Sequence, residues 1–341
     1  MNDEIIGYLA MFANVILFSL APVFYKSVNY NIINNLTISA IALCLFAVIY
    51  LIYKHFTDKS YFKINNTKIP NTLGLTANPI QNLFNPKVLW ISIMSQIRFI
   101  TQYLSYLFLP MSIVAPIISL GTFSVMYFSH LLNKTDIIAV DYIASIIAII
   151  GIICVNWNKI WNSNNESKKI STSSYLIGIS LALLSLIFGG YVFVVNKDMT
   201  EILTPMQTIL NEGFGAAIMM IIGWVIYAFI PKNTFKSMFG VVQTFPTIPE
   251  LWKSMAFFFF IFNFAMLFRY IALNNISEVI AAIVFNLSVI VSLFYGKIFF
   301  NEEMNMTKII GSIIVMLSVI VISIKDSPSI KLIINMIKKW F

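Results

Sequence analysis

Long stretches without a charged side chain recur along the whole chain. No Asp, Glu, Lys or Arg occurs between Glu4 and Lys26, between Lys26 and Lys54, or between Lys169 and Lys197. A transmembrane helix needs about 20 consecutive, mostly apolar residues to cross the hydrocarbon core of a bilayer. Splitting the apolar runs at polar turns therefore predicts ten spans, near residues 5–25, 33–53, 88–108, 112–132, 138–157, 174–195, 206–230, 252–272, 278–299 and 307–324.

The composition agrees with a lipid environment. Of the 341 residues, 59% are hydrophobic and only 11% are charged, and the mean hydropathy is +0.85. A soluble domain carries about 25% charged residues, so this chain has too little polar surface to cover a soluble globule. We predict an all-α integral membrane protein with the lipid bilayer as a partner. The net charge of +8 is spread over loops and tail and suits a membrane surface better than a nucleic-acid groove, so no nucleic-acid partner is expected.

Two polar connections and the two ends of the chain complete the pattern. Residues 54–87, rich in Asn, Lys, Thr and Pro, and residues 231–251, with three prolines, are typical of surface loops. The acidic start, Met1–Glu4, differs from the positive start of a signal peptide, so we expect the first apolar run to be retained as a span. Residues 330–341 are amphipathic and basic, which predicts a segment lying on the membrane surface.

The chain also shows signs of an internal duplication. A shift of 167 residues places Ala144 on Gly311 and Asp136 on Glu303. Each half then holds five spans, and because five is odd the second half must be inverted relative to the first. Inverted repeats around a central site are a recurring transporter design. We predict a first five-helix repeat in residues 1–160, including loop 54–87, a second in residues 170–326, and a basic amphipathic tail in residues 327–341.

The loop charges give a weak preference for one orientation. With the N-terminus inside, inner segments hold slightly more lysines than outer segments, and the positive-inside rule favours that arrangement. The basic tail and loop 54–87 point the same way. We predict a multi-pass protein of the cell (inner) membrane with both termini cytoplasmic, with an organelle membrane as the alternative. Monomer and homodimer both remain open.

Residues 267–322, "LFRYIALNNISEVIAAIVFNLSVIVSLFYGKIFFNEEMNMTKIIGSIIVMLSVIVI", join an aromatic-Ala-Leu helix end to a helix rich in small residues. In this segment Glu302 precedes Gly311 by nine residues. The pattern resembles the second repeat of the drug/metabolite transporter superfamily, EamA-like branch, and residues 106–155 look like the first-repeat copy. The resemblance implies ten spans, inverted repeats and solute transport. Thr135 departs from it by standing where the first repeat often has a glutamate.

Arg98 is a cation in the middle of the third span. It lies about 11 residues past the start of the span, roughly 16 Å into the bilayer at a rise of about 1.5 Å per residue. A cation at that depth costs about 2.5–3.5 kcal/mol on insertion scales, so it should face the protein interior or a wet cavity. Ser95, Arg98, Gln102 and Ser105 fall on one helical face. A polar stripe on an apolar helix is what a solute pathway needs.

Two interpretations of Arg98 stay open. In one, it binds an anionic group of a solute, and Gln102 and Tyr106 add hydrogen bonds. In the other, it is a structural partner of Glu212, because charges inside a membrane usually pair. Glu212 lies about seven residues into its span, roughly 10 Å deep. It is a candidate for proton coupling, for an ion pair with Arg269 on the adjacent span, or for a partly exposed helix end. Arg269 itself is a candidate for reaching back to the interface.

Other polar and small residues are weaker candidates. Lys26 and Lys197 occupy matching ends of spans one and six and are candidate gates, although lysines at helix ends commonly extend to the interface. Further candidates for lining the solute site are Tyr25, Tyr191, Asn263 and Asn286. Candidates for helix kinks are Pro22, Pro116 and the pair Gly189–Gly190. Gly151 and Gly311 are expected to allow close helix packing.

These features favour a secondary transporter that moves a small organic metabolite by alternating access. The solute is an amino acid or another small molecule, anionic ones included, and proton coupling is one option. A lipid-carrier flippase on the same fold is the alternative. A membrane-embedded enzyme is disfavoured, because the two distant histidines, His55 and His130, and the apolar Cys44 and Cys154 provide neither a nucleophile–base arrangement nor a metal cluster. We expect no metal or cofactor, and the absence of a GxxxxGK[ST] loop argues against direct ATP drive.

Overall fold

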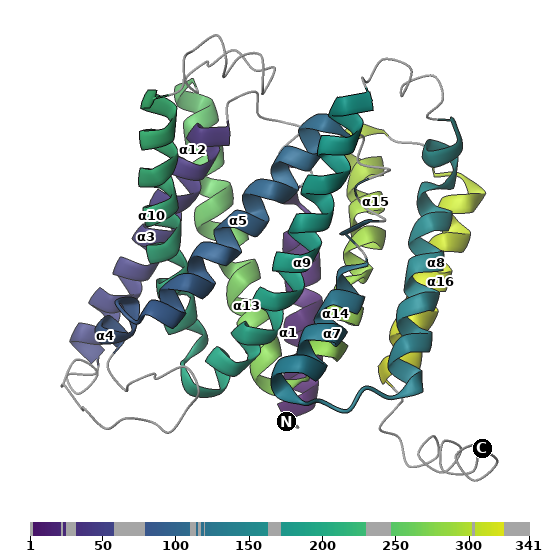
Figure 1. The fold of residues 1–341 in the computed structure, drawn as a ribbon, viewed down its shortest axis with the longest axis horizontal. Coiled ribbons are helices and arrows are strands. Elements are labelled where there is room, and N and C mark those ends of the chain that lie inside the picture. Colours follow the sequence, from purple (N-terminus) through teal and green to yellow (C-terminus); the bar gives the residue numbers. More distant parts are fainter. Residues whose placement is uncertain are drawn as a thin grey trace.

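The structure is a computed structural model, and all of its described secondary structure is helical (Figure 1). It describes residues 3–21, 23–24, 32–57, 79–109, 114, 117–118, 120–162, 172–229, 247–301 and 304–323. Several predictions fall outside these residues: those for Pro22, Tyr25, Lys26, Pro116, the side chain of Tyr106 and the tail at 327–341.

The described part of the first half of the chain contains five long helices and one short one. They are α1 (Asp3–Phe18), α3 (Ile32–Thr57), α4 (Pro79–Leu83), α5 (Pro86–Phe108), α7 (Gly121–Asn133) and α8 (Ala139–Asn162). The start of α5 shows how the sequence sets a boundary. Asn85 precedes it, and its side chain accepts a hydrogen bond from the backbone N–H of Lys87 at 2.9 Å. Pro86 follows at the first helical position, where its missing N–H costs nothing.

The described part of the second half is also helical, and several of its helices follow one another with little or no connection. Its helices are α9 (Thr172–Ile202), α10 (Pro205–Phe229), α12 (Ile248–Ala256), η3 (Phe257–Phe262), α13 (Asn263–Asn275), α14 (Glu278–Phe285), α15 (Leu287–Phe300) and α16 (Met306–Ser323). Helices α12, η3 and α13 follow one another directly, and η3 is a π-helical turn. At Asn286 the backbone N–H donates three residues back, to Ile283, and this tighter turn separates α14 from α15.

Three boundaries differ from the predicted ones. Loop 54–87 is shorter, because α3 continues to Thr57 and α4 forms within it. Loop 231–251 ends early, since Thr247 and Glu250 form a capping box that starts α12 at Ile248. The span at 278–299 is divided at Asn286. Apolarity marks how long a span is, whereas caps and local turns decide where each helix begins and ends.

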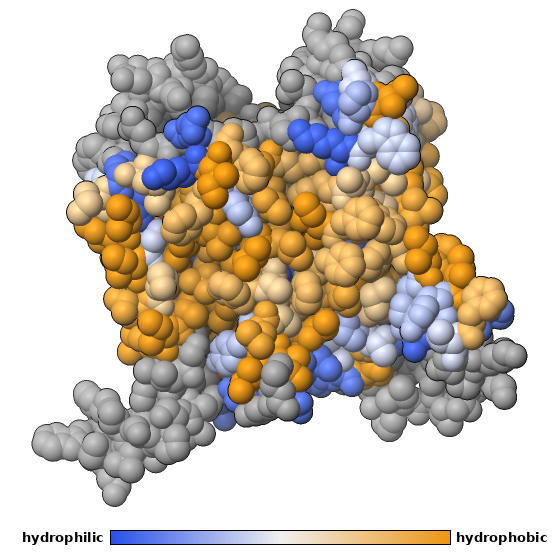
Figure 2. Space-filling model, turned by 180° about the vertical axis from the view of Figure 1, so that it is seen from behind, coloured by the Kyte–Doolittle hydropathy of each residue, from blue (hydrophilic) through white to orange (hydrophobic). Residues whose placement is uncertain are grey.

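The face of the bundle seen in Figure 2 carries a broad apolar band, with hydrophilic residues gathered toward its two ends. Among the described residues, five helices are long and apolar enough to cross a membrane: Thr37–Thr57, Tyr175–Ile202, Pro205–Phe229, Ile248–Asn275 and Glu278–Phe299. Residues 139–155 and 306–321 form shorter apolar helices. The chain is therefore a multi-pass membrane protein. The start of α1 and the end of α16 lie at the same end of the bundle (Figure 1).

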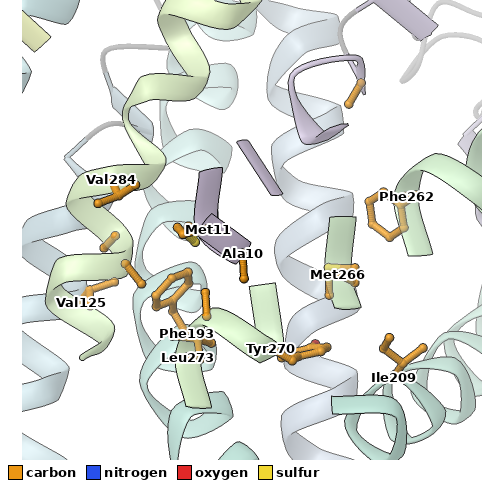
Figure 3. Packing of buried hydrophobic residues seen from close by; sticks show 14 of the residues in the cluster. Ala10, Met11, Val125, Phe193, Ile209, Phe262, Met266, Tyr270, Leu273 and Val284 are labelled. Atoms are coloured by element: carbon orange, nitrogen blue, oxygen red, sulfur yellow. The ribbon is translucent and has the colours of Figure 1, made fainter. Parts of the chain in front are cut away.

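Helices from the two halves of the chain pack against one another throughout the bundle. The most extensive pairs are α8 with α16, α5 with α9, α1 with α13 and α3 with α10. The main apolar core is built from both halves and includes Met11, Val125, Phe193 and Tyr270 (Figure 3).

Small residues bring particular helices close together. A Cβ atom added at Gly151 would lie 2.8 Å from the backbone oxygen of Gly311, so α8 and α16 touch backbone to backbone, as predicted for these glycines. Helix α9 runs unbroken through Gly189 and Gly190, the pair for which a kink is predicted. Both glycines admit neighbouring helices, since a Cβ at Gly190 would lie 2.1 Å from Oγ of Ser124 and one at Gly189 would lie 3.1 Å from Nε of Arg98.

Candidate functional site

The carboxyl group of Glu212, in the first half of α10, is the centre of a buried hydrogen-bond network. The hydroxyl of Ser95 donates to Oε2 at 2.8 Å, and the hydroxyl of Tyr270 donates to Oε1 at 2.8 Å. Amide groups of Gln96 and Asn196 point at the same carboxyl, at 3.4 Å and 3.5 Å. All five residues are buried. The four donors come from α5, α9 and α13, so three helices meet around a side chain of a fourth.

Close helix packing makes this convergence possible. A Cβ atom at Gly215 of α10 would lie 2.5 Å from Cβ of Ser92 on α5. Because Gly215 has no side chain, α5 can approach α10 closely enough for Ser95 and Gln96 to reach Glu212. An unpaired carboxylate in an apolar interior is costly, and hydrogen bonds offset that cost.

The network is chemically suited to a carboxyl group that gains and loses a proton. Hydroxyl groups such as those of Ser95 and Tyr270 can donate a hydrogen bond to a carboxylate and can also accept one from a carboxylic acid. Both protonation states of Glu212 can therefore be satisfied by rotation of hydroxyl groups, without movement of a helix. This property is what a proton-carrying residue requires.

Arg269 is enclosed by aromatic rings. Its guanidinium carbon lies 5.0 Å from the ring centroid of Phe193, 5.3 Å from that of Phe285 and 5.8 Å from that of Phe18. The residue is buried, so the expectation that it extends to the interface is wrong. Among the described residues, Glu212 and Arg269 form no direct ion pair. The hydroxyl of Tyr270 and the amide of Asn196 occupy the Oε1 side of the carboxyl.

The polar face predicted on α5 is buried. Ser95, Arg98, Thr101 and Ser105 all lie in the interior, and Gln102 is partly buried. The guanidinium of Arg98 lies 5.1 Å from the ring centroid of the neighbouring Phe99. Its Nε would lie 3.1 Å from a Cβ added at Gly189, so this glycine of α9 leaves room for the arginine. The prediction that Arg98 faces the protein interior is confirmed.

Other candidate residues have separate surroundings. The amide of Asn263 donates to the backbone oxygen of Ala42 at 3.4 Å, and the amide of Asn286 donates to Oγ1 of Thr122 at 3.3 Å. The ring of Tyr191 packs edge-on against Phe128, with centroids 5.6 Å apart. The structure places these three residues against α3 and α7 rather than in the Glu212 network.

Lys197, the candidate gate of α9, forms an ion pair with Glu201 at 3.4 Å, one turn further along the same helix. Within the described part of the chain, no group of three or more His, Cys, Asp or Glu is placed to hold a metal ion.

A second buried carboxyl escaped the sequence-based reasoning. Glu278, at the start of α14, accepts hydrogen bonds from the hydroxyls of Ser129 and Thr135, the latter at 3.3 Å. Two residues before Thr135, the side-chain amide of Asn133 donates a hydrogen bond to Asp198 of α9 at 2.9 Å. The available signal was that Glu278 is one of only two charges between Lys253 and Lys297.

Comparison with known proteins fits this picture. Residues 176–324 match the model of the EamA-like transporter family. This match confirms the resemblance to the drug/metabolite transporter superfamily. The EamA-like family consists of membrane transporters for small solutes. The matched region of this chain contains Glu212, Arg269 and Tyr270. No curated protein matches the chain.

Solved structures share the fold. Twenty-eight chains match. One of them, described as "Crystal structure of protein", has a TM-score of 0.69 and 10% sequence identity, over 94% of this chain and 98% of that chain. Likeness at this identity concerns the fold alone.

Proposed function

We propose that this EamA-like protein is a secondary transporter that moves a small organic solute by alternating access between two inverted five-helix repeats. We further propose that protonation of Glu212 is coupled to that movement. The bonding of Glu212 across the two halves of the chain carries the proposal, and the match to the EamA-like family supports it.

Backbone geometry supports the two repeats. The described non-glycine residues with positive φ are Lys134 (52°) and Asn301 (51°), and they lie 167 residues apart at the ends of α7 and α15. Leu109 and Ile276, again 167 residues apart, are both extended residues that end α5 and α13. Each donates its N–H four residues back, at 2.9 Å. The same shift aligned the sequence, so equivalent helices end in equivalent ways.

Helix packing supports the same symmetry. Under that shift, α5 is equivalent to α13 and α1 is equivalent to α9, and the pair α5–α9 has its counterpart in the pair α1–α13. The pairs α3–α10 and α8–α16 each join a helix to its own equivalent. Equivalent helices run in opposite directions (Figure 1). This is the arrangement expected of inverted repeats related by an axis in the membrane plane.

The hydrogen bonds of Glu212 connect the two repeats. Ser95 and Gln96 belong to the first repeat, whereas Asn196 and Tyr270 belong to the second, as does Glu212 itself. Rocking of one repeat against the other would separate the carboxyl from Ser95 and Gln96 while leaving its partners in the second repeat in place. The two states then differ in how strongly they hold a proton, which is the differential affinity that coupling requires.

The test uses the purified full-length protein in liposomes. Wild-type protein should give flux of at least one member of a small-solute panel, amino acids first, and a pH gradient should accelerate it. Glu212→Gln keeps the shape of the side chain but cannot exchange a proton, so it should retain solute exchange and lose the response to the gradient. Glu201→Gln, on the exposed end of α9, is the matched control and should respond as the wild type does.

Two results would contradict the proposal. Absence of any protein-dependent solute flux removes the transport function, and flux of lipid carriers alone would favour the flippase alternative. A full response of Glu212→Gln to the pH gradient removes the coupling role and leaves transport intact.

A further inference from the structure

Arg269 has hydrogen-bonding capacity that the described protein leaves unused. The residue is 3% exposed, and its buried Nε–H has no acceptor within the described part of the chain. The rings of Phe18, Phe193 and Phe285 surround the guanidinium at 5.0–5.8 Å. Aromatic faces attract a cation, but they do not provide the in-plane oxygen acceptors that a guanidinium fork binds.

The guanidinium lies toward the interior of the bundle. Side chains on an α-helix tilt toward the N-terminus of the helix, and for Arg269 this direction leads away from the nearby helix end at Asn275. The contact with Phe18 of α1 agrees, because the Phe18 ring also lies 6.2 Å from that of Phe262, which precedes α13. The guanidinium therefore lies among rings of α1, α9 and α14. One of these rings, that of Phe193, belongs to the apolar core shown in Figure 3.

A second unsatisfied polar atom lies at the same helix pair. Asn14 of α1 is fully buried, and its amide donates to the backbone oxygen of Ala265 on α13 at 2.6 Å. Its Oδ1 has no partner among the described residues. Asn14 lies one turn before Phe18, and Ala265 lies one turn before Arg269. Buried polar groups in proteins are almost always hydrogen-bonded, so two unsatisfied ones at the α1–α13 interface point to a site that a bound molecule completes.

We propose that Arg269 binds the anionic group of the transported solute, and that this solute is an organic carboxylate with an apolar body. A carboxylate is planar and accepts two parallel hydrogen bonds from a guanidinium fork. A phosphate carries more charge and three acceptor oxygens, and the three phenylalanines provide no donors for them. The rings of Phe18, Phe193 and Phe285 suit an apolar body. This inference rests on the transport function proposed above and assigns the anion site to Arg269 instead of Arg98.

The guanidinium is enclosed in this conformation, so the solute reaches it when the repeats separate. Its carboxylate would then neutralise Arg269, while Glu212 keeps its partners in the second repeat, Asn196 and Tyr270. The two groups thus have separate tasks, anion binding for Arg269 and proton exchange for Glu212.

The experiment measures binding to the purified full-length protein in detergent, by calorimetry and thermal stabilisation. The probes share a six-carbon body: hexanoate, hexyl phosphate, hexanol and hexylamine. Wild-type protein should bind hexanoate at least ten-fold more tightly than the other three. Arg269→Gln should lose at least ten-fold in hexanoate affinity, and Glu201→Gln should lose nothing. Arg269→Lys keeps the charge without the planar fork and should be intermediate.

The variants also cover a failure to fold. If Arg269→Gln does not fold, Arg269→Lys and Phe193→Leu test the anion site in its place. Each of these two variants should weaken hexanoate binding. Unchanged hexanoate affinity in these variants overturns the proposal, as does loss of binding in Arg98→Gln with retention in Arg269→Gln. A preference for hexyl phosphate, or no hexanoate binding to the wild-type protein, contradicts the proposal that the solute is a carboxylate.

The two proposals fail separately. Flux of uncharged or cationic solutes without hexanoate binding leaves transport standing and removes the anion site. Arg269-dependent hexanoate binding without any solute flux keeps the site and removes the transport function.

Discussion

Replacement of Gly190 by alanine should destabilise the protein, although alanine is the better helix former. Gly190 lies in the middle of α9, opposite Ser124 of α7. An added Cβ would lie 2.1 Å from Oγ of Ser124, 2.6 Å from its Cβ and 2.7 Å from its backbone carbonyl carbon. Rotation of the serine hydroxyl relieves only the first of these clashes, so the α7 backbone must move away from α9.

The size of the effect follows from these distances. Ordinary contact begins at 3.4 Å, so the carbonyl carbon of Ser124 must retreat by 3.4 Å less 2.7 Å, or 0.7 Å. Overpacking of this kind lowers the free energy of unfolding by about 1–3 kcal/mol. Replacing a mid-helix glycine by alanine raises it by about 0.5–1 kcal/mol, because alanine loses less backbone freedom on folding. We expect Gly190→Ala to lower the free energy of unfolding by about 1–2 kcal/mol.

Gly223 of α10 provides the matched control, because a Cβ there would meet nothing within 4 Å. Gly223→Ala should gain about 0.5–1 kcal/mol from helix propensity alone. The assay is unfolding of both purified variants in mixed micelles with increasing SDS, followed by circular dichroism. If Gly190→Ala proves as stable as Gly223→Ala, the close approach of α7 and α9 is wrong.

Two further variants probe the site and the helix pair at the bundle edge. Tyr270→Phe removes the 2.8 Å hydrogen bond to Glu212 and keeps the ring; thermal unfolding should show a loss of about 1–2 kcal/mol, and an unchanged midpoint would count against the buried network. In Gly311→Leu the Cβ alone would lie 2.5 Å from the backbone oxygen of Gly151, so α8 and α16 must separate. Size-exclusion chromatography should show a loss of folded protein larger than for Gly190→Ala, whereas Met316→Leu, at an exposed position of α16, should behave as the wild type does.

The sequence predicted the features that depend on local chain properties. The lengths of the charge-free runs gave the membrane class and the approximate position of each helix, because the thickness of a bilayer sets a minimum length. The cost of a charge inside a membrane gave the burial of Arg98. The small size of Gly151 and Gly311 predicted the close helix contact that the structure shows between them. The family resemblance, confirmed by the match of residues 176–324, was visible in the spacing of a few residues.

The sequence did not predict the partners of the buried charges. Ser95 and Asn196 meet the same carboxyl of Glu212 from positions 117 and 16 residues away in the chain. Helical spacing shows which residues share a face, but it does not show which face of another helix lies opposite. For the same reason Arg269 was expected at the interface or in an ion pair, and the phenylalanines around it come from α1, α9 and α14.

Amino-acid order by itself determined that this chain inserts into a membrane as apolar helices, and the spacing of its small and polar residues indicated a duplication. Tertiary structure alone decided that one carboxyl is held by donors from both halves of the chain and that one guanidinium is enclosed by phenylalanine rings. The physical reason is that hydrophobicity acts on each segment separately, whereas hydrogen bonds and ring contacts act over a few ångströms between segments that only folding brings together.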